Sequence, residues 1–522
     1  MNRNIYLVGF MGSGKTTVGR LLAQALNRRF VDMDEILEKR FRKPIREVFL
    51  KSGEPGFRAK ESALLENIAK QEGLVVATGG GAPEREANRK LMRSTGAVVH
   101  LHVDFETSQK RLGAGQRAAR PLWTEKTAVQ SLFESRKSLY ADCDFSVESD
   151  GKKPERVSEA ILQRLMPEER FVARLGSAEC PIIATLNAPE AIAEQAKGRK
   201  TALVTDSAVL RLHGQRYRSL MERSALITLS PGDKSKTLAN ARRIYEALIS
   251  NEFDRDDFLI ALGGGVVTDL AAFAASTYKR GMDHALVATT LVGCVDAAIG
   301  GKSAVNVGSV KNVVGSFNAP RVVALDIAAL RTLGPRRRSE GLVEAYKTGL
   351  VASPELVGVI ERRASALMSG DLVLLSRVAR FSARAKADVI SRDFRESGLR
   401  RILNFGHTFG HAVESLHHFR VSHGQAVALG MRVAAEISRA RGLLSSQMAA
   451  RINSTLGVIA PYTVGMPPVD EAWKIMQQDK KNRRGKMVFV LLNNAGRAIC
   501  VDDLSKEELA AAVQRVRGSE HG

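Results

Sequence analysis

Eight residues near the N-terminus have the types and spacing needed to bind phosphate. Gly9-Phe10-Met11-Gly12-Ser13-Gly14-Lys15-Thr16 matches the pattern GxxxxGK[ST] at every fixed position. An apolar run over 5–8 precedes the loop and predicts a buried strand, and residues 17–26 predict a helix after it. Loop N–H groups and the helix N-terminus can then surround phosphate oxygens. Lys15 is expected to reach the β- and γ-phosphates of a nucleoside triphosphate, and Thr16 to hold Mg²⁺.

Further residues of the N-terminal third could bind the molecule that receives the phosphate. Asp34 follows the second expected strand, and Gly79–Gly81 follows the third, where ligands of open α/β sheets bind. Arg58, Arg120 and Arg136 add guanidinium groups, which pair well with carboxylates. A single arginine is more often a solvated surface charge. Their coexistence with the phosphate loop favours an anion-binding pocket.

The C-terminal half carries residues of the metal-ligating types. His407 and His411 stand four positions apart, which puts both on one face of a helix. With Glu344 and His423 available, two histidines and a glutamate would form a common catalytic zinc arrangement. A histidine pair of this spacing is equally often a hydrogen-bonded pair without metal, so both interpretations stay open. The segment HTFGH lacks the glutamate of the zinc-protease motif HExxH, so the sequence does not predict a zinc protease.

A second glycine turn, Gly263-Gly264-Gly265, lies between an expected strand and a helix beginning near Asp269. It suits a pyrophosphate at a helix N-terminus. It is not GxGxxG, so an ordinary tight turn remains an alternative. A set of cations accompanies it, namely Lys302, Lys311, Lys347, Lys386, Arg400 and Lys480.

The elements that must position these residues alternate between strand and helix. Besides 5–8, strands are expected at 30–31, 74–77, 97–101, 202–205, 225–229, 258–262 and 285–288, and a helix at 155–165. This alternation predicts parallel α/β sheets. From about residue 340 the pattern becomes mainly helical. We expect a P-loop domain over 1–166, a linker over 167–171, a Rossmann-like α/β domain over 172–335 and an α-helical domain over 336–522.

Composition narrows the function classes. The chain has 522 residues and a net charge of +22, but its basic residues are dispersed and only 5% of residues are aromatic, which argues against nucleic-acid binding. Four distant cysteines argue against a disulfide scaffold. No apolar run is long enough for a membrane span and no signal peptide is recognisable. We expect a cytoplasmic enzyme with small-molecule substrates and without nucleic-acid or membrane partners.

Residues 1–165 resemble shikimate kinase, with all the motifs in order. The resemblance implies ATP- and Mg²⁺-dependent phosphorylation of the 3-hydroxyl of shikimate. It implies that ATP contacts Gly12, Ser13, Gly14, Lys15, Thr16, Thr17 and Arg120, the last in a lid. It also implies that shikimate contacts Asp34, Arg58, Gly79, Gly80, Gly81 and Arg136, with Lys15 and Asp34 catalytic.

Residues 172–515 resemble 3-dehydroquinate synthase, most clearly in GGGVVTDLAAFAASTYKRG, TTLVGCVDAAIGGKSAVN, EAYK and GLRRILNFGHTFGHAVE. The resemblance implies an NAD- and metal-dependent lyase that converts 3-deoxy-D-arabino-heptulosonate 7-phosphate into 3-dehydroquinate and phosphate. The implied ligands of the metal, expected to be Zn²⁺, are Glu344, His407 and His423. The implied NAD contacts are Gly232, Asp233, Lys236, Gly265, Val266, Val267, Thr268, Asp269, Thr289, Thr290, Lys302, Lys311, Ala329, Leu330, Arg331 and Thr332. The implied substrate contacts are Asp296, Lys302, Asn312, Lys347, Lys386, Arg400, Asn404, His411 and Lys480, and all of these except Asp296, Asn312 and Lys480 are expected to be catalytic.

Four positions depart from the pattern of the synthase family: Asp233, Thr268, Ala272 and Phe394. The combined resemblance implies a bifunctional enzyme of chorismate and aromatic amino-acid biosynthesis, with a homodimer formed through the synthase half. An alternative keeps the folds but changes the substrates, joining another small-metabolite kinase to a different sugar-phosphate cyclase.

Overall fold

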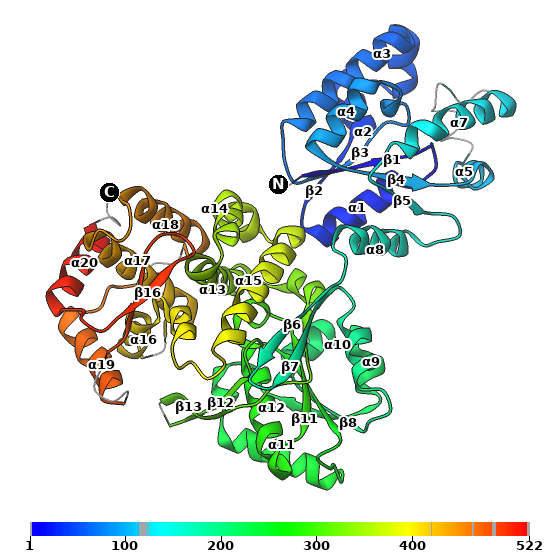
Figure 1. Cartoon of the computed structure of the whole chain (residues 1–522). Coiled ribbons are helices and arrows are strands. Elements are labelled where there is room, and N and C mark those ends of the chain that lie inside the picture. The colour runs from blue at the N-terminus through cyan, green and yellow to red at the C-terminus, as the bar shows by residue number, and fades with distance from the viewer. Residues whose placement is uncertain are drawn as a thin grey trace. The chain divides into compact units, whose positions relative to one another are not determined.

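The computed structural model describes residues 3–113, 122, 125–308, 310–418, 420–461, 464–482 and 487–518. Two compact units divide the chain, Met1–Pro167 and Glu168–Gly522 (Figure 1). Within the described residues no helix is long and apolar enough to cross a membrane.

The first unit is built on a parallel sheet with strand order β2-β3-β1-β4-β5. Its strands are β1 (Asn4–Val8), β2 (Arg29–Asp32), β3 (Leu74–Ala77), β4 (Gly96–His102) and β5 (Phe145–Glu148). Its helices are α1 (Lys15–Leu26), α2 (Met33–Phe41), α3 (Ile45–Ala69), α4 (Glu86–Thr95), α5 (Phe105–Arg111), α7 (Lys126–Ala141) and α8 (Pro154–Leu165), with a 3₁₀ turn η1 (Ala82–Glu84). The strands expected from the sequence, and the helices at 17–26 and 155–165, are confirmed.

Helices cover both faces of this sheet, with α1 and α8 together on one and α3 and α4 on the other (Figure 1). Strands β1 and β3 are buried along their whole length, as expected for apolar runs in a parallel sheet. Parallel strands bring their carboxyl ends to one edge. The phosphate loop after β1, Asp32 at the end of β2 and the glycines after β3 therefore meet at that edge.

The second unit contains a larger sheet of order β6-β7-β14-β11-β10-β8-β9, parallel except for the pair β6 and β7. Its strands are β6 (Glu169–Leu175), β7 (Ala178–Thr185), β8 (Thr201–Asp206), β9 (Ser224–Leu229), β10 (Phe258–Gly263), β11 (Asp283–Ala288) and β14 (Val322–Asp326). Residues 169–171, which the sequence assigned to a linker, begin strand β6 and pair with β7.

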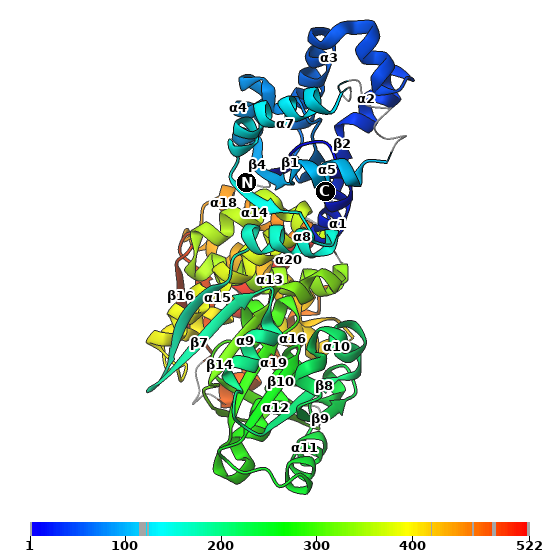
Figure 2. The same ribbon diagram turned by 90° about the vertical axis from the view of Figure 1, so that its right-hand side faces the viewer.

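Four helices pack against this sheet in two pairs (Figure 2). They are α9 (Ala188–Gln195) with α10 (Ser207–Met221), and α11 (Leu238–Ser250) with α12 (Gly265–Thr277). The chain moves outward from β8 to β9 and then back to β10, so right-handed crossovers put the two pairs on opposite faces. The reversal makes a switch point beside the carboxyl end of β10, where nucleotides bind in such sheets.

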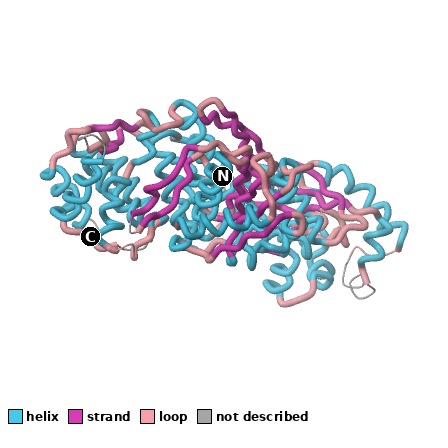
Figure 3. Tube along the Cα trace, turned by 90° about the horizontal axis from the view of Figure 1, so that it is seen from below, coloured by secondary structure: helices cyan, strands magenta, loops and turns pink. Residues whose placement is uncertain are grey.

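The C-terminal region is mainly helical (Figure 3), as the sequence predicted. Its helices are α13 (Pro335–Ala352), α14 (Pro354–Ser369), α15 (Leu372–Arg392), α16 (His407–Leu416), α17 (His423–Ala440), α18 (Ser446–Ile459), α19 (Val469–Asn482) and α20 (Lys506–Gly518). Two hairpins, β12 (Lys302–Val307) with β13 (Val310–Phe317) and β15 (Phe489–Leu492) with β16 (Ala498–Val501), and short turns η5 (Ile327–Thr332) and η6 (Leu399–Asn404) complete the unit.

Candidate active sites

The phosphate loop has the backbone that its glycines permit. Gly12 and Gly14 have φ of 78° and 94°, a region that residues with a Cβ rarely adopt. Gly14 is also the N-cap of α1, so the helix begins with Lys15. Lys15 Nζ donates to the carbonyls of Gly9 (2.7 Å) and Phe10 (3.0 Å), which holds the ammonium against the loop.

Hard oxygen ligands stand beside this loop. Thr16 Oγ1 donates to Asp32 Oδ2 at 2.7 Å, while Asp32 Oδ1 accepts the N–H of Asp34 at 3.0 Å and so caps α2. A hydroxyl and a carboxylate are ligands that Mg²⁺ prefers, so the residues fit this ion. The capping bond also places Asp34 in the first turn of α2, at the same edge of the sheet.

The predicted arginines and glycines of the acceptor pocket lie together. Arg58 and Arg136 are 8% and 3% exposed. A Cβ at Gly81 would stand 2.1 Å from Arg58 Nη2, and one at Gly80 would stand 3.7 Å from Arg136 Nη1. The absence of a side chain at Gly81 is therefore what lets the Arg58 guanidinium lie against the backbone. Arg120 lies outside the described residues.

Two glutamates of this pocket escaped sequence reasoning. Glu61 Oε2 accepts from Arg58 Nη1 at 2.9 Å, and Glu84 contacts both arginines. Burial disfavours the charge on Arg58, but Glu61, Glu84 and Glu54 outweigh it and raise the pKa of Arg58. Glu61 follows Arg58 by three positions on α3, a spacing that predicts an ion pair. Nothing in the sequence indicates the contacts of Glu84, because they join separate elements.

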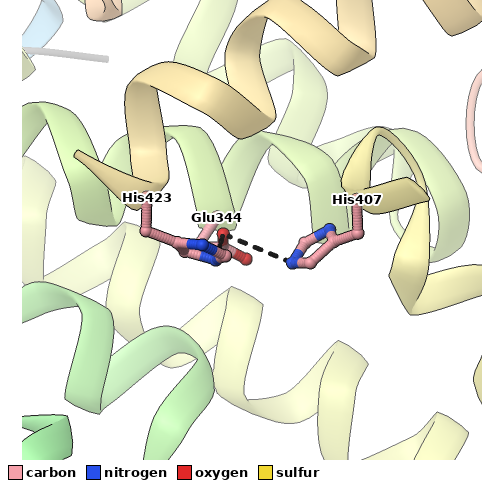
Figure 4. Close-up of side chains that lie close together, drawn as sticks. All are labelled: Glu344, His407 and His423. Atoms are coloured by element: carbon pink, nitrogen blue, oxygen red, sulfur yellow. Dashed lines mark ion pairs between the residues drawn. The ribbon is translucent and has the colours of Figure 1, made fainter. Parts of the chain in front are cut away.

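In the second unit Glu344, His407 and His423 converge (Figure 4). They come from α13 and from the first residues of α16 and α17. Glu344 Oε1 lies 3.2 Å from Nε2 of His423 and 3.8 Å from Nε2 of His407. Among the described residues, this buried carboxylate oxygen has no hydrogen-bond partner. An orphaned oxygen facing two imidazole nitrogens is what a divalent metal would satisfy, so the set fits a metal.

Charges around the cluster tune its protonation. Burial, followed by Lys347, lowers the pKa of His407, so its imidazole is neutral, as a metal ligand must be. Burial also disfavours charge on His423, but Glu344 and Glu414 overcome this and raise its pKa to about 10. Glu414 Oε2 lies 3.2 Å from His423 Nδ1, so it orients the imidazole ring through the nitrogen that does not face Glu344. Sequence reasoning missed Glu414, although it follows His411 by three positions on α16.

A buried network of alternating charge extends from the cluster. Lys347 Nζ donates to Glu344 Oε2 at 2.6 Å and lies 3.8 Å from Asp296 Oδ1. Lys386 Nζ donates to Asp296 Oδ1 at 2.5 Å and to its carbonyl at 2.7 Å. Burial lowers the pKa of Lys386 to about 8. Burial opposes ionisation of Asp296, yet Lys386 and Lys347 lower its pKa to about 2.

A second group of predicted substrate contacts is organised by Glu396. This carboxylate pairs with Lys302 and accepts from Asn404 Nδ2 at 2.6 Å. Arg400 is buried, and Nη1 donates to the carbonyls of Phe394 (2.6 Å) and Gly300 (3.2 Å). Glu396 was missed because a single acid in a loop gives no spacing signal.

Two further predicted substrate contacts, His411 and Lys480, differ in how far the structure places them. His411 lies one turn after His407, with ring centroids 5.4 Å apart. Lys480 lies on α19, but its side chain is outside the described part of the chain.

The predicted nucleotide contacts gather at the carboxyl edge of the larger sheet. Gly265 begins α12 directly after β10, and Thr289 follows β11. Lys236 Nζ donates to Asp269 Oδ2 at 2.5 Å and also contacts Asn312, so a predicted substrate contact adjoins the nucleotide set. The other members of the set lie on α12 (Val266, Val267, Thr268), after β11 (Thr290), before or in a 3₁₀ turn (Gly232, Asp233), on β13 (Lys311) and in η5 (Ala329, Leu330, Arg331, Thr332).

Three of the departures from the family pattern have defined side-chain contacts. Asp233 Oδ2 lies 3.5 Å from Lys311 Nζ. Thr268 Oγ1 donates back to the carbonyl of Gly265 at 3.2 Å, within the first turn of α12. Phe394 packs edge-on against Phe317, with centroids 5.4 Å apart. In these contacts none of the three residues touches Glu344, His407 or His423.

Comparison with known families agrees with this division of chemistry. The family model described as shikimate kinase matches residues 11–166. The models described as 3-dehydroquinate synthase N-terminal and C-terminal match residues 226–340 and 341–482.

Among solved structures, ValA, a 2-epi-5-epi-valiolone synthase from Streptomyces hygroscopicus subsp. jinggangensis 5008 with NAD⁺ and Zn²⁺ bound, is 25% identical. The match covers 67% of this chain and 99% of that one, with a TM-score of 0.62. A 2-deoxy-scyllo-inosose synthase shares the fold at 22% identity and a TM-score of 0.60, covering 66% of this chain and 99% of its own.

The fold and the sites thus define a phosphate-loop kinase followed by a cyclising synthase with a dinucleotide-binding sheet. A bifunctional shikimate kinase/3-dehydroquinate synthase from Thermotoga maritima is 32% identical over 93% of this chain and 94% of its own length. A 3-dehydroquinate synthase from Rhodopseudomonas palustris is 37% identical over 64% of this chain and 91% of its own. The chain belongs to the family of bifunctional shikimate kinase/3-dehydroquinate synthases, and it carries both enzyme activities of that family.

Proposed function

We propose that the N-terminal unit transfers the γ-phosphoryl group of ATP to the 3-hydroxyl of shikimate through the residues gathered at the sheet edge. The loop over 12–17 binds the phosphates, and Lys15 neutralises charge on the transferring group. Mg²⁺, held by Thr16 with Asp32 nearby, supplies charge neutralisation when bound. The predicted lid residue Arg120 remains part of the proposal.

The acceptor is held by complementary charge. Arg58 and Arg136 bind the carboxylate of shikimate, since two buried guanidiniums fit a planar anion. Asp34 binds a ring hydroxyl and accepts its proton, while the glycines at 79–81 leave room for the ring. Fixing donor and acceptor in line supplies most of the rate enhancement in such a transfer.

For the C-terminal unit we propose conversion of 3-deoxy-D-arabino-heptulosonate 7-phosphate into 3-dehydroquinate and phosphate. Bound NAD⁺ and a divalent metal, Zn²⁺ by analogy with ValA, supply reversible hydride acceptance and Lewis acidity. Glu344, His407 and His423 would hold the metal. The contacts at the carboxyl edge of β10 and β11 would hold the dinucleotide.

The chain's own residues would bind and orient the acidic, phosphorylated substrate. The substrate contacts expected from the family, Asp296, Lys302, Asn312, Lys347, Lys386, Arg400, Asn404, His411 and Lys480, include five cations. Several of these lie buried, where attraction to carboxylate and phosphate is stronger than in water. Lys347 and Lys386 already face Asp296, so their ammonium groups are held in place before substrate arrives.

The observation that carries the synthase assignment is the convergence of one carboxylate and two imidazoles from three helices. The test is phosphate release from the heptulosonate substrate by the full chain, with and without NAD⁺ and a chelator. Activity that needs both NAD⁺ and metal supports the proposal. Turnover of sedoheptulose 7-phosphate with no turnover of the carboxylated substrate would instead support the alternative, a different cyclase.

Three finer expectations belong to this proposal and rest on the family resemblance. They are a homodimer formed through the synthase unit, a cytoplasmic location and the division of that unit near residue 335. Size-exclusion chromatography with light scattering tests the first.

A further inference from the structure

One carboxylate of the chain occupies the two arginines of the proposed shikimate pocket. Glu84 Oε1 accepts from Nε of Arg136 at 2.7 Å and lies 2.7 Å from its Nη2. Glu84 Oε2 lies 3.2 Å from Nε of Arg58. Each oxygen of Glu84 therefore faces a different arginine, which is the arrangement a bound carboxylate would adopt between them.

The surrounding charge makes Glu84 an obstacle to an acidic ligand. Arg58 is already paired with Glu61 at 2.9 Å and with Glu54 at 3.3 Å. With Glu84 in place, three carboxylates surround two guanidiniums, and a further anion would meet net negative charge. If Glu84 leaves, two guanidiniums and two carboxylates balance, and the faces of Arg58 and Arg136 that Glu84 occupied become free to bind the ligand.

Glu54 and Glu84 are the partly exposed carboxylates of this group, and of these two only Glu84 also contacts Arg136. Arg58, Arg136 and Glu61 have side chains that are only 9%, 3% and 1% exposed, whereas that of Glu84 is 31% exposed. It ends the short 3₁₀ turn η1 and is separated from α4 by Arg85, so a rotamer change carries its carboxylate into water without unfolding an element. Glu61 has no such route, because it is buried on α3.

We propose that Glu84 is an internal competitor for the carboxylate of shikimate: it bridges Arg58 and Arg136 in the free enzyme and swings into solvent when substrate binds. This inference rests on the proposed function, in which those arginines bind that carboxylate. This competition raises selectivity for carboxylate ligands. Only a ligand whose carboxylate binds both arginines compensates for the contacts that they lose with Glu84. If about nine tenths of the free enzyme is bridged, the apparent dissociation constant is raised about tenfold.

The test measures kinase kinetics of the full chain with Glu84→Gln, which keeps the shape and removes the charge. We expect KM for shikimate to fall about three- to tenfold, with kcat within about twofold and KM for ATP unchanged. The matched control is Glu86→Gln, two positions away at an exposed position of α4, where Glu86 pairs only with Lys90 at 2.8 Å among the described contacts. This control should leave KM for shikimate unchanged.

The methyl ester of shikimate provides a second test, because it lacks the carboxylate charge that competes with Glu84 for the two arginines. For the ester, Glu84→Gln should give no gain in binding, as measured by titration calorimetry. An unchanged KM for shikimate in Glu84→Gln overturns the proposal. A raised KM also overturns it, since that result would mean that Glu84 supports the arginines and does not compete for them.

Failure of the proposed function would look different. Arg136→Met should raise KM for shikimate strongly if this arginine binds the carboxylate. If Arg136→Met leaves KM unchanged, the pocket assignment itself is wrong. If Arg136→Met raises KM while Glu84→Gln changes nothing, only the competition is wrong.

Discussion

The kinase pocket and the synthase cluster balance buried charge in different ways. In the kinase, a partly exposed glutamate reaches into a buried pair of arginines. In the synthase, Glu344 and Lys347 lie 1% and 2% exposed on one helix, with oxygen and nitrogen 2.6 Å apart. The first arrangement can open by a side-chain rotation. In the second both side chains are buried on one helix, so a side-chain rotation alone does not carry either charge into water.

The comparison suggests that each unit meets a different demand. A phosphoryl-transfer site must admit and release its acceptor in each cycle, and a movable charge allows this. A site that carries one substrate through several steps gains from charges that do not reorganise. Four substitutions test whether the two units differ in this way.

Lys15→Ala should reduce shikimate phosphorylation by about a thousandfold or more, because the transferring phosphoryl group loses its main cation. ADP formation coupled to shikimate measures this. Phosphate release from the heptulosonate substrate should stay within about twofold, since Lys15 lies in the first unit and the proposed synthase residues lie in the second. Loss of both activities would show that the two sites are not independent.

His407→Ala should remove bound metal and lower synthase activity by about a hundredfold or more, because one of three ligands is lost. Metal content per chain, measured by mass spectrometry, is the direct readout, and kinase activity is the internal standard. His418→Asn, at an exposed position two residues beyond α16, is the matched control. Full metal content in His407→Ala would contradict the ligand assignment.

Lys347→Met should destabilise the synthase unit by about 3 kcal/mol, because it leaves Glu344 charged and buried without its partner. Urea unfolding followed by far-UV circular dichroism of the full chain measures this, because the variants lack a catalytic residue, and loss of kinase activity reports separately on the other unit. The Glu344→Gln/Lys347→Met double variant should recover part of the loss. Glu84→Gln should cost far less, since Glu84 is partly exposed; equal losses would remove the contrast between the units.

Lys386 should impose an alkaline limit on the synthase. Burial lowers its pKa to about 8, so kcat/KM should fall by up to about tenfold per pH unit above that value as the ammonium loses its proton. The unfolded chain keeps this proton up to about pH 10.5, so between these values the unfolded state binds more protons and Lys386 makes stability rise with pH. Lys386→Arg should move the fall in kcat/KM to higher pH. An identical profile would exclude Lys386 as its source.

Much of the fold followed from local patterns. The expected strands and the two kinase helices were confirmed because apolar runs bounded by glycine turns have few other ways to be buried. Residues 169–171 were missed as a strand because Pro167 and the polar run around it look like a linker. Pairing with β7 then made residues 169–171 part of the sheet.

The site residues also fall into two classes, those predicted from the sequence and those recognised only in the structure. The sequence alone determined the phosphate loop and, through family resemblance, the metal-ligating and cationic side chains, because these depend on residue types at fixed spacing. Only the tertiary structure revealed that Glu84 bridges two arginines, that Glu414 supports His423 and that Glu396 joins Lys302 to Asn404. Each of these contacts joins separate secondary-structure elements or crosses a loop, and an ion pair between such partners leaves no periodic trace along the chain.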